Sequence, residues 1–358
     1  MWSGSEELWS KSAKALKNKG YSVSFATRYD HPELEKIEAP HINFYKYPTL
    51  SILRRGVEKV AEKYFRKDIL KKYILRIKPR LIIISQGNNY ESIAVMKRCV
   101  ELNIPYVTIT QLVGEIFLGS IPNEMLSLLQ KCYLAASKNF FVSQHNLKLN
   151  NLLLGLDLPN AETIYNPCKL GVSDIPIYPD DNYNIGLVGR LECWHKGYDI
   201  IIQIADKRRW KERPVKFNIY GIGPNEEMLK ANILNRSLSN VVLKGFNNHV
   251  TCIWQENQIL CMPSRMEGQA LALIEAMWCE RAAVVTNVGG AAELIEEEHS
   301  GFIAEAPTVE AVDAALERAW GQRSRWQEMG RNAAAGLKAK YPVDSVAYLN
   351  EQILKQLH

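Results

Sequence analysis

The chain has 358 residues, 47% hydrophobic and 23% charged, with a formal net charge of +5. This length favours two domains, and the composition is that of a globular protein. So mild a charge does not indicate nucleic-acid binding. No hydrophobic run approaches the length of a membrane span and no secretory signal is recognisable, so we expect a cytoplasmic protein. The seven cysteines include no CxxC pair, which predicts reduced thiols in the protein core rather than disulfides or zinc ligands.

Short hydrophobic strands alternate with helical segments along the first half, a pattern typical of parallel sheets covered by helices. The opening residues MWSGSEELW predict a loop entering a helix with Gly4 and Ser5 at its N-terminus. The strand that normally opens such a domain is missing, because the chain is truncated or because the first sheet is built differently. We predict helices over 11–20 and 91–103. The predicted strands are 21–27, 80–85, 105–110, 140–143 and 162–167.

Residues 54–80 carry most of the excess positive charge. Their hydrophobic residues approximate a helical stripe, and a solvated helix packed on a sheet is the favoured interpretation. The alternative is attraction to a polyanionic acceptor or peripheral contact with the inner face of a membrane.

The second half repeats the strand–helix pattern after a linker at 173–184 that is rich in Pro, Asp and Asn. We predict helices over 197–207 and 225–233. The predicted strands are 184–189, 217–221, 240–245, 258–264 and 282–287. The sequence thus predicts an α/β protein with domains at 1–172 and 173–341, followed by a helical segment at 342–358. Open α/β sheets bind ligands at the carboxyl ends of their strands.

Three features of the second half indicate a phosphorylated ligand. Arg190 and Lys196 follow the strand 184–189 and could clamp a diphosphate. A glycine turn at 221–223 follows the next strand. Residues 268–270 would present backbone N–H groups at the start of a helix, a natural anion site. Each feature has a plain alternative, a surface charge or a simple turn, and their coincidence at successive strand ends favours the ligand.

Glu267 and Glu275 stand eight residues apart in SRMEGQALALIEAM. Glu275 is surrounded by hydrophobic neighbours in sequence, so its carboxylate is expected to be buried beside a polar partner. Other chemistries have little support, because the sequence contains no Asp-x-Asp, HExxH, GxxxxGK[ST] or GxSxG. We therefore predict no metal site. His195 is expected to be a loop residue, and His145 is a modest candidate for the cleft.

The stretches VGRLECWHKG, YGIGP, PSRMEGQALALIEAM and TNVGGAAELI closely resemble the carboxy-terminal domain of GT4-type, group 1 glycosyltransferases. The first half is similar more loosely: SGSEELWSKSAKALKNKGYSV resembles the family's glycine loop and first helix, and TIYNP its approach to the linker. The resemblance covers essentially the whole chain. It implies the GT-B fold, two doubly wound Rossmann-like domains facing a cleft. It also implies a retaining enzyme that uses a nucleotide-diphosphate sugar and neither metal nor cofactor. The final helix would cross back to the first domain.

By this resemblance, Glu275 would accept hydrogen bonds from the nucleotide ribose and Glu267 would reach the hydroxyls of the donor sugar. Arg190 and Lys196 would bind the diphosphate and stabilise the leaving group. Gly4 would let the first domain approach the phosphates. The remaining positions implied at the donor-nucleotide site are Gly221, Gly223, Gly245, Phe246, Gly268, Gln269, Ala270 and Leu271.

The chain departs from the family pattern in two places. Family members often have EGFG where this chain has Glu267-Gly268-Gln269-Ala270, so Gln269 would offer its amide to the donor sugar. They also often carry a histidine after the strand 105–110. Gln111 is the nearest residue here, and with His145 it forms the expected acceptor side.

We therefore predict a glycosyltransferase that moves a sugar from a UDP- or GDP-linked donor to a saccharide or lipid-linked acceptor, in polysaccharide or glycoconjugate synthesis. The alternatives are a sugar-nucleotide epimerase or phosphorylase of the same fold, or a non-catalytic protein that binds nucleotide sugars.

Overall fold

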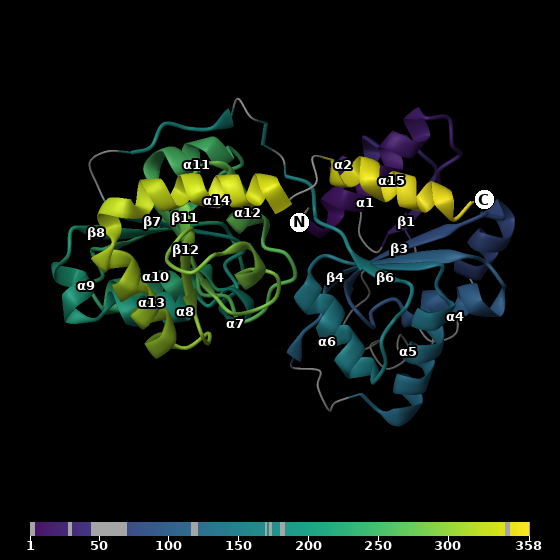
Figure 1. Cartoon of the computed structure of the whole chain (residues 1–358), viewed down its shortest axis with the longest axis horizontal. Helices are drawn as coiled ribbons and strands as arrows, with labels where there is room; N and C mark the ends of the chain where they lie inside the picture. Colours follow the sequence, from purple (N-terminus) through teal and green to yellow (C-terminus); the bar gives the residue numbers. More distant parts are fainter. Residues whose placement is uncertain are drawn as a thin grey trace, which may run out of the picture.

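The structure, a computed structural model, describes residues 4–27, 31–43, 70–115, 121–168, 170–171, 174–179, 183–340 and 344–357. Its strands form parallel sheets in two halves of the chain, with helices packed around them (Figure 1). The α/β class predicted from the sequence is confirmed.

The described first half begins with helix α1 at Gly4, as predicted, and contains two sheets. A two-stranded parallel sheet pairs β1 with β2, and a four-stranded parallel sheet has the order β3-β4-β5-β6. The elements are α1 (Gly4–Asn18), β1 (Phe25–Thr27), α2 (Pro32–Glu35), β2 (His41–Asn43), β3 (Ile82–Asn88), α4 (Ile93–Glu101), β4 (Tyr106–Leu112), α5 (Asn123–Ala135), β5 (Lys138–Phe141), α6 (Gln144–Leu154) and β6 (Ala161–Thr163).

The second half contains one six-stranded parallel sheet of order β12-β11-β10-β7-β8-β9. Its strands are β7 (Tyr183–Val188), β8 (Val215–Tyr220), β9 (Val241–Gly245), β10 (Ile259–Met262), β11 (Ala282–Thr286) and β12 (Gly301–Ala304). Its helices are α7 (Cys193–Lys196), α8 (Tyr198–Ala205), α9 (Arg208–Glu212), α10 (Glu226–Asn235), α11 (Val250–Glu256), α12 (Leu271–Trp278), η4 (Ala292–Leu294), α13 (Val309–Gly321), η5 (Arg323–Arg325) and α14 (Trp326–Lys340).

This second sheet is buried on both faces, which explains why its central strands are continuous hydrophobic runs. Ile259 and Cys261 of β10 face the core under α8 and α13, whereas Leu260 and Met262 face the core under α12 and α14. Figure 1 shows these two helix pairs on opposite sides of the sheet. The strand order reverses direction between β7 and β10, and such a switch point opens a crevice at the carboxyl ends of the two strands.

The last helix, α15 (Ser345–Lys355), returns to the first half and packs beside α1 (Figure 1). Leu349 and Ile353 join a core cluster with Leu8, and the Ser12 Oγ donates to Asn350 Oδ1 at 2.5 Å. Asp344 starts the helix by accepting a hydrogen bond from the Ala347 N–H at 2.8 Å.

Most of the basic segment, residues 54–69, lies outside the described residues. Residues 70–77 are helical and bury Ile74, so the choice between a solvated helix and a membrane-contacting one stays a prediction. Within the described ranges, no helix is long and apolar enough to cross a membrane.

The cysteine prediction needs one correction. All seven are free, and five are buried, but Cys168 is half-buried and Cys252 is exposed. Cys252 lies on the outer side of α11, so it is not part of the core.

Candidate functional site

The candidate site lies at the switch point of the second sheet, where β7 and β10 end side by side. The loop after β7 carries Arg190 and leads into α7, which ends at Lys196. The loop after β10 carries Ser264 and Glu267 and leads into α12. Neighbouring parallel strands therefore bring together residues that are far apart in the sequence.

Lys196 and Glu267 form an ion pair that joins the segments after β7 and β10. The Lys196 Nζ lies 2.6 Å from Glu267 Oε1. The same oxygen accepts a hydrogen bond from the Ser264 hydroxyl at 2.7 Å. Glu267 is buried, so both contacts hold its carboxylate in one orientation. An ammonium group has three N–H donors, so Lys196 can also serve an oxyanion.

Gly197 allows Lys196 to approach the end of β10. Its φ of +68° is left-handed, and an added Cβ would stand 2.0 Å from the Pro263 carbonyl oxygen. Only glycine combines that conformation with that approach. The turn from α7 to α8 therefore packs directly on the strand that precedes Glu267.

Arg265 and Asp199 fix this turn, and the sequence analysis did not identify them. Both terminal nitrogens of Arg265 bond to the Asp199 carboxylate, at 2.8 and 2.7 Å. Arg265 also donates to the Cys193 carbonyl at 2.7 Å, and its backbone N–H donates to the His195 carbonyl at 2.7 Å. A bidentate pair of this kind is among the more specific charge contacts in proteins. The available signal was an arginine two residues before Glu267.

Arg190 is more exposed than Lys196, and it forms a longer ion pair with Glu192, at 3.5 Å. His195 Nδ1 lies 3.3 Å from the same carboxylate. The expectation that His195 is a loop residue was wrong, because it belongs to the short helix α7. The diphosphate role of Arg190 stays a prediction.

The loops after β7 and β8 are packed closely on each other through glycines. An added Cβ on Gly221 would stand 1.9 Å from the Gly189 carbonyl oxygen, and one on Gly223 would stand 2.5 Å from that of Leu191. Beyond them, Gly245 has a φ of +70° and Phe246 is 66% exposed. These positions lie at the carboxyl ends of β7, β8 and β9 along one sheet edge, and their role at the donor-nucleotide site stays a prediction.

Helix α12 starts directly after the 267–270 loop, with Ala270 as its N-cap residue and Leu271 as its first residue. Glu275 lies in this helix and is half-buried. The expectation of full burial was wrong, because Glu275 shares the partly open side of α12 with Leu271 and Trp278, while the other side of the helix packs into the core. A half-exposed carboxylate can meet a ligand without a large desolvation cost.

The two halves meet at the 267–270 loop. An added Cβ on Gly268 would stand 1.7 Å from the Gln111 carbonyl oxygen at the end of β4. The Gln269 Oε1 accepts a hydrogen bond from the Asn166 backbone N–H at 2.5 Å. The Asn166 and Gln111 side-chain amides bond to each other in both directions, at 2.9 and 3.2 Å. The amide oxygen of Gln269 is therefore hydrogen-bonded to the first half. The Nε2–H groups have no hydrogen-bond partner among the described residues, so they remain to donate to a sugar.

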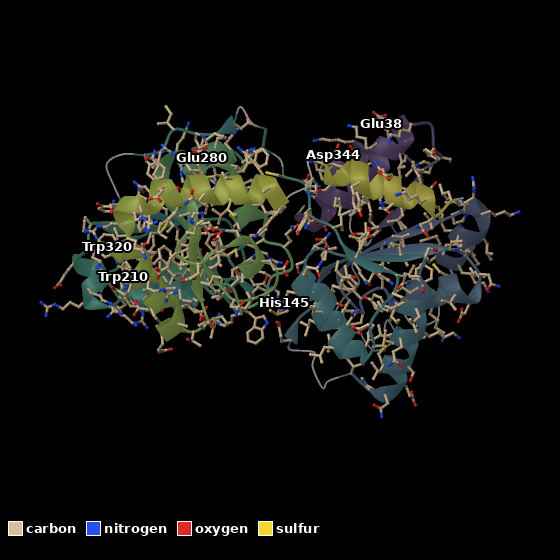
Figure 2. All side chains as sticks on the ribbon, in the orientation of Figure 1. Glu38, His145, Trp210, Glu280, Trp320 and Asp344 are labelled. Atoms are coloured by element: carbon tan, nitrogen blue, oxygen red, sulfur yellow. The ribbon has the colours of Figure 1, made fainter. Side chains whose placement is uncertain are left out.

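His145 lies at the boundary between the two halves, as Figure 2 shows. Its ring Nε2 is 2.7 Å from Glu115 Oε1, and its backbone N–H donates to Glu293 Oε1 at 2.5 Å. The hydrogen bond with Glu115 raises the pKa of His145, and the same bond lowers the pKa of Glu115. His145 is thus an ion-paired residue of the junction, and its acceptor-side role stays a prediction.

The described residues contain no group of three or more His, Cys, Asp or Glu side chains placed to hold a metal ion. The charged groups at the ends of β7 and β10 include the cations Arg190 and Lys196 and the carboxylates paired with them, Glu192 and Glu267. Gly4 is the first residue of α1, and its approach to a phosphate stays a prediction.

Comparison with known proteins adds a family match. Residues 174–335 match the family model of glycosyl transferases group 1. A poly(ribitol-phosphate) alpha-N-acetylglucosaminyltransferase of Staphylococcus aureus (strain COL) is 26% identical over 198 residues, 55% of this chain and 40% of that protein. An uncharacterized glycosyltransferase of Haemophilus influenzae is 24% identical over 331 residues, 88% of this chain and 86% of that protein. The chain spans only 40%, 39% and 44% of the lengths of the first three curated relatives that it matches.

Among solved structures, Anabaena HepE in complex with UDP aligns with a TM-score of 0.73 at 18% identity, over 99% of this chain and 96% of that chain. At this identity the likeness establishes the fold. The GT-B fold implied by the sequence resemblance is therefore confirmed.

Proposed function

We propose that this protein, whose residues 174–335 match the family model of group 1 glycosyltransferases, is a retaining, metal-independent transferase. It moves a sugar from a UDP- or GDP-linked donor to a hydroxyl of a saccharide or lipid-linked acceptor, in polysaccharide or glycoconjugate synthesis. The observation that carries the proposal is the Lys196–Glu267 pair at the switch point of the second sheet, with the adjoining Gly268 packed on Gln111 of the first half.

In the proposed reaction, the bond between the sugar C1 and the diphosphate oxygen breaks, and its electron pair stays on the diphosphate. The acceptor oxygen attacks C1 from the face that the diphosphate leaves, and its proton passes to a leaving phosphate oxygen. The configuration at C1 is therefore retained.

Lys196 and Arg190 stabilise the negative charge that grows on the leaving diphosphate. Charges held in position before the reaction act without a reorganisation cost. The Glu267 carboxylate orients Lys196 at 2.6 Å and accepts hydrogen bonds from hydroxyls of the transferred sugar. Two cations at the diphosphate provide the charge stabilisation that a metal supplies in other enzymes.

Glu275 binds the ribose hydroxyls of the nucleotide from α12. The glycine loops after β7, β8 and β9 let the backbone approach the nucleotide closely, and Phe246 supplies an exposed aromatic ring beside them. Gln269 donates its Nε2 to the donor sugar while its Oε1 stays bonded to Asn166.

A donor panel tests the proposal. UDP- and GDP-linked hexoses and N-acetylhexosamines are incubated with and without saccharide and lipid-linked acceptors, and free nucleotide is measured. Acceptor-dependent release of UDP or GDP is the expected result, with an unchanged anomeric configuration of the product by NMR. Interconversion of sugar nucleotides would identify an epimerase instead, and tight binding without turnover would identify a non-catalytic binding protein.

Peripheral membrane contact is a separate part of the proposal. Its support is the basic segment, of which Lys72, Arg76 and Lys78 are exposed on the described part. Co-sedimentation with vesicles rich in anionic lipid, lost at high salt, is the expected result. Equal binding to neutral vesicles would contradict it.

A further inference from the structure

A short segment of the second half, residues 289–293, lies against the start of helix α6 in the first half. Glu293 Oε2 accepts a hydrogen bond from the Gln144 backbone N–H at 3.2 Å, and Oε1 accepts one from the His145 backbone N–H at 2.5 Å. Gly290 is equally close, since an added Cβ would stand 2.6 Å from the Ser143 Cβ. We call this set of contacts the closure contact.

The closure contact fits the chemistry of a helix start. The first N–H groups of a helix have no partner within the helix, and negative charge is favoured beside them. Ser143 caps α6 by accepting from the Asn146 N–H at 3.1 Å. Glu293 satisfies the two N–H groups before it, so the second half completes the cap of a first-half helix.

The same segment also holds the loop that carries Glu267. The Gly290 N–H donates to the Gly268 carbonyl at 2.9 Å. Gly289 has a φ of +55°, and an added Cβ there would stand 1.8 Å from the Glu267 carbonyl oxygen. Residues 289–293 therefore contact α6 on one side and the Glu267–Gly268 loop on the other.

We propose that Glu293 is a positioning residue of the transfer reaction. Its carboxylate docks on α6 when the two halves close, and through residues 289–290 it fixes Glu267 and Gly268 against the first half. The kinetic part of this inference rests on the proposed function, whereas closure itself does not. A site closed in this way excludes water, which otherwise hydrolyses the activated donor.

Gln144 permits a sharp test, because it is the first residue of α6. Proline is well tolerated at that helix position, and Ser143 before it is extended (φ −156°, ψ 159°), as a residue before proline should be. Gln144→Pro therefore removes one donor to Glu293 without disturbing the helix. Gln144→Ala is the matched control, because it removes only the side-chain bond to Thr163. Glu293→Gln removes the negative charge on the second-half side of the closure contact. Its control is Glu296→Gln, which removes the same charge at a nearby exposed position.

Three quantities are measured for each variant: the radius of gyration by small-angle scattering with and without UDP or GDP, the affinity for that nucleotide, and the ratio of donor hydrolysis to transfer. Gln144→Pro and Glu293→Gln should lose nucleotide-induced compaction, and nucleotide affinity should fall with it, because a ligand that drives closure binds the closed form better. Misplacement of about 1 Å can cost ~10²-fold in turnover, so kcat should fall by about one to two orders of magnitude, and the hydrolysis ratio should rise. The double variant should lose less than the sum of the two single losses, because both substitutions act on the same contact between Glu293 and the start of α6.

Wild-type compaction and hydrolysis ratios in both variants would overturn the inference. So would a Gln144→Ala variant that behaves like Gln144→Pro, since the backbone donor would then be irrelevant. If scattering separates the variants while no donor is turned over even by the wild type, the closure contact stands and the proposed function fails.

Discussion

Replacing Gly268 with alanine should block closure of the two halves. An added Cβ would stand 1.7 Å from the Gln111 carbonyl oxygen, 2.9 Å from its carbonyl carbon and 3.3 Å from Val142 Cγ2. Since real Cβ atoms essentially never come within 3.0 Å of another atom, the first pair must separate by at least 1.3 Å. The obstacle is backbone of the central strand β4, which cannot rotate away as a side chain would. The junction itself must therefore open.

An opening of that size predicts a loss in kcat of at least ~10²-fold, the usual cost of a displacement near 1 Å, or about 2.7 kcal/mol in the barrier. Steady-state kinetics measure kcat, and calorimetric titration of UDP or GDP measures the nucleotide affinity. Nucleotide affinity should fall less than kcat, because the nucleotide contacts proposed for α12 and the glycine loops lie in the second half and only the contribution of closure to binding is lost. Gly336→Ala is the control: Gly336 lies in α14 with no atom within 4 Å of an added Cβ. A Gly268→Ala enzyme with wild-type kcat would refute the reasoning.

The remaining predictions concern charged groups. Glu267→Gln should spare binding of the bare nucleoside diphosphate but lower kcat, and Lys196→Ala should lower kcat by roughly 10²–10³-fold; unchanged kcat in both would remove the pair from the mechanism. Glu275→Gln should weaken nucleotide binding by about 1.5–3 kcal/mol, and equal calorimetric affinity would exclude the ribose contact. The pKa of His145 is raised from 6.5 and that of Glu115 is lowered from 4.5. Their ion pair therefore stabilises the fold fully between these two values, and the stabilisation is lost as pH rises through the raised value or falls through the lowered one. The melting-temperature difference between wild type and His145→Gln should be largest in that window, and a difference independent of pH would contradict it. EDTA should leave activity largely intact.

Local signals were enough to place much of the second half. β11 and β10 are short hydrophobic runs between turn residues, and both were predicted within two residues of their observed ends. The glycine turn after β8 was also predicted from neighbouring residues alone, because Gly221 and Gly223 follow the strand directly. The amphipathic helices α13 and α14 and the strand β12 were not predicted, although Thr308 provides a helix cap at the start of α13.

The contacts of the site could not be predicted in the same way. Lys196 and Glu267 were each identified, but their 2.6 Å pairing depends on β7 lying beside β10. That neighbourhood is set by strand order, not by any pattern along the chain. The Gln111–Asn166–Gln269 bonds depend further on how the two halves meet. Gln269 was expected to offer its amide to the donor sugar, yet its Oε1 accepts a hydrogen bond from Asn166 of the first half.

The position of α15 has a consequence for the order in which the protein folds during synthesis. Its residues Leu349 and Ile353 cover the cluster that contains Leu8 and Phe140, but they leave the ribosome after all of the second half. Domains generally fold as units in order of emergence. The second sheet can therefore complete its two cores while the α1 side of the first half is still uncovered. A nascent chain stalled before residue 344 should expose that apolar cluster and depend on chaperones, even though every strand of the sheets has already been made.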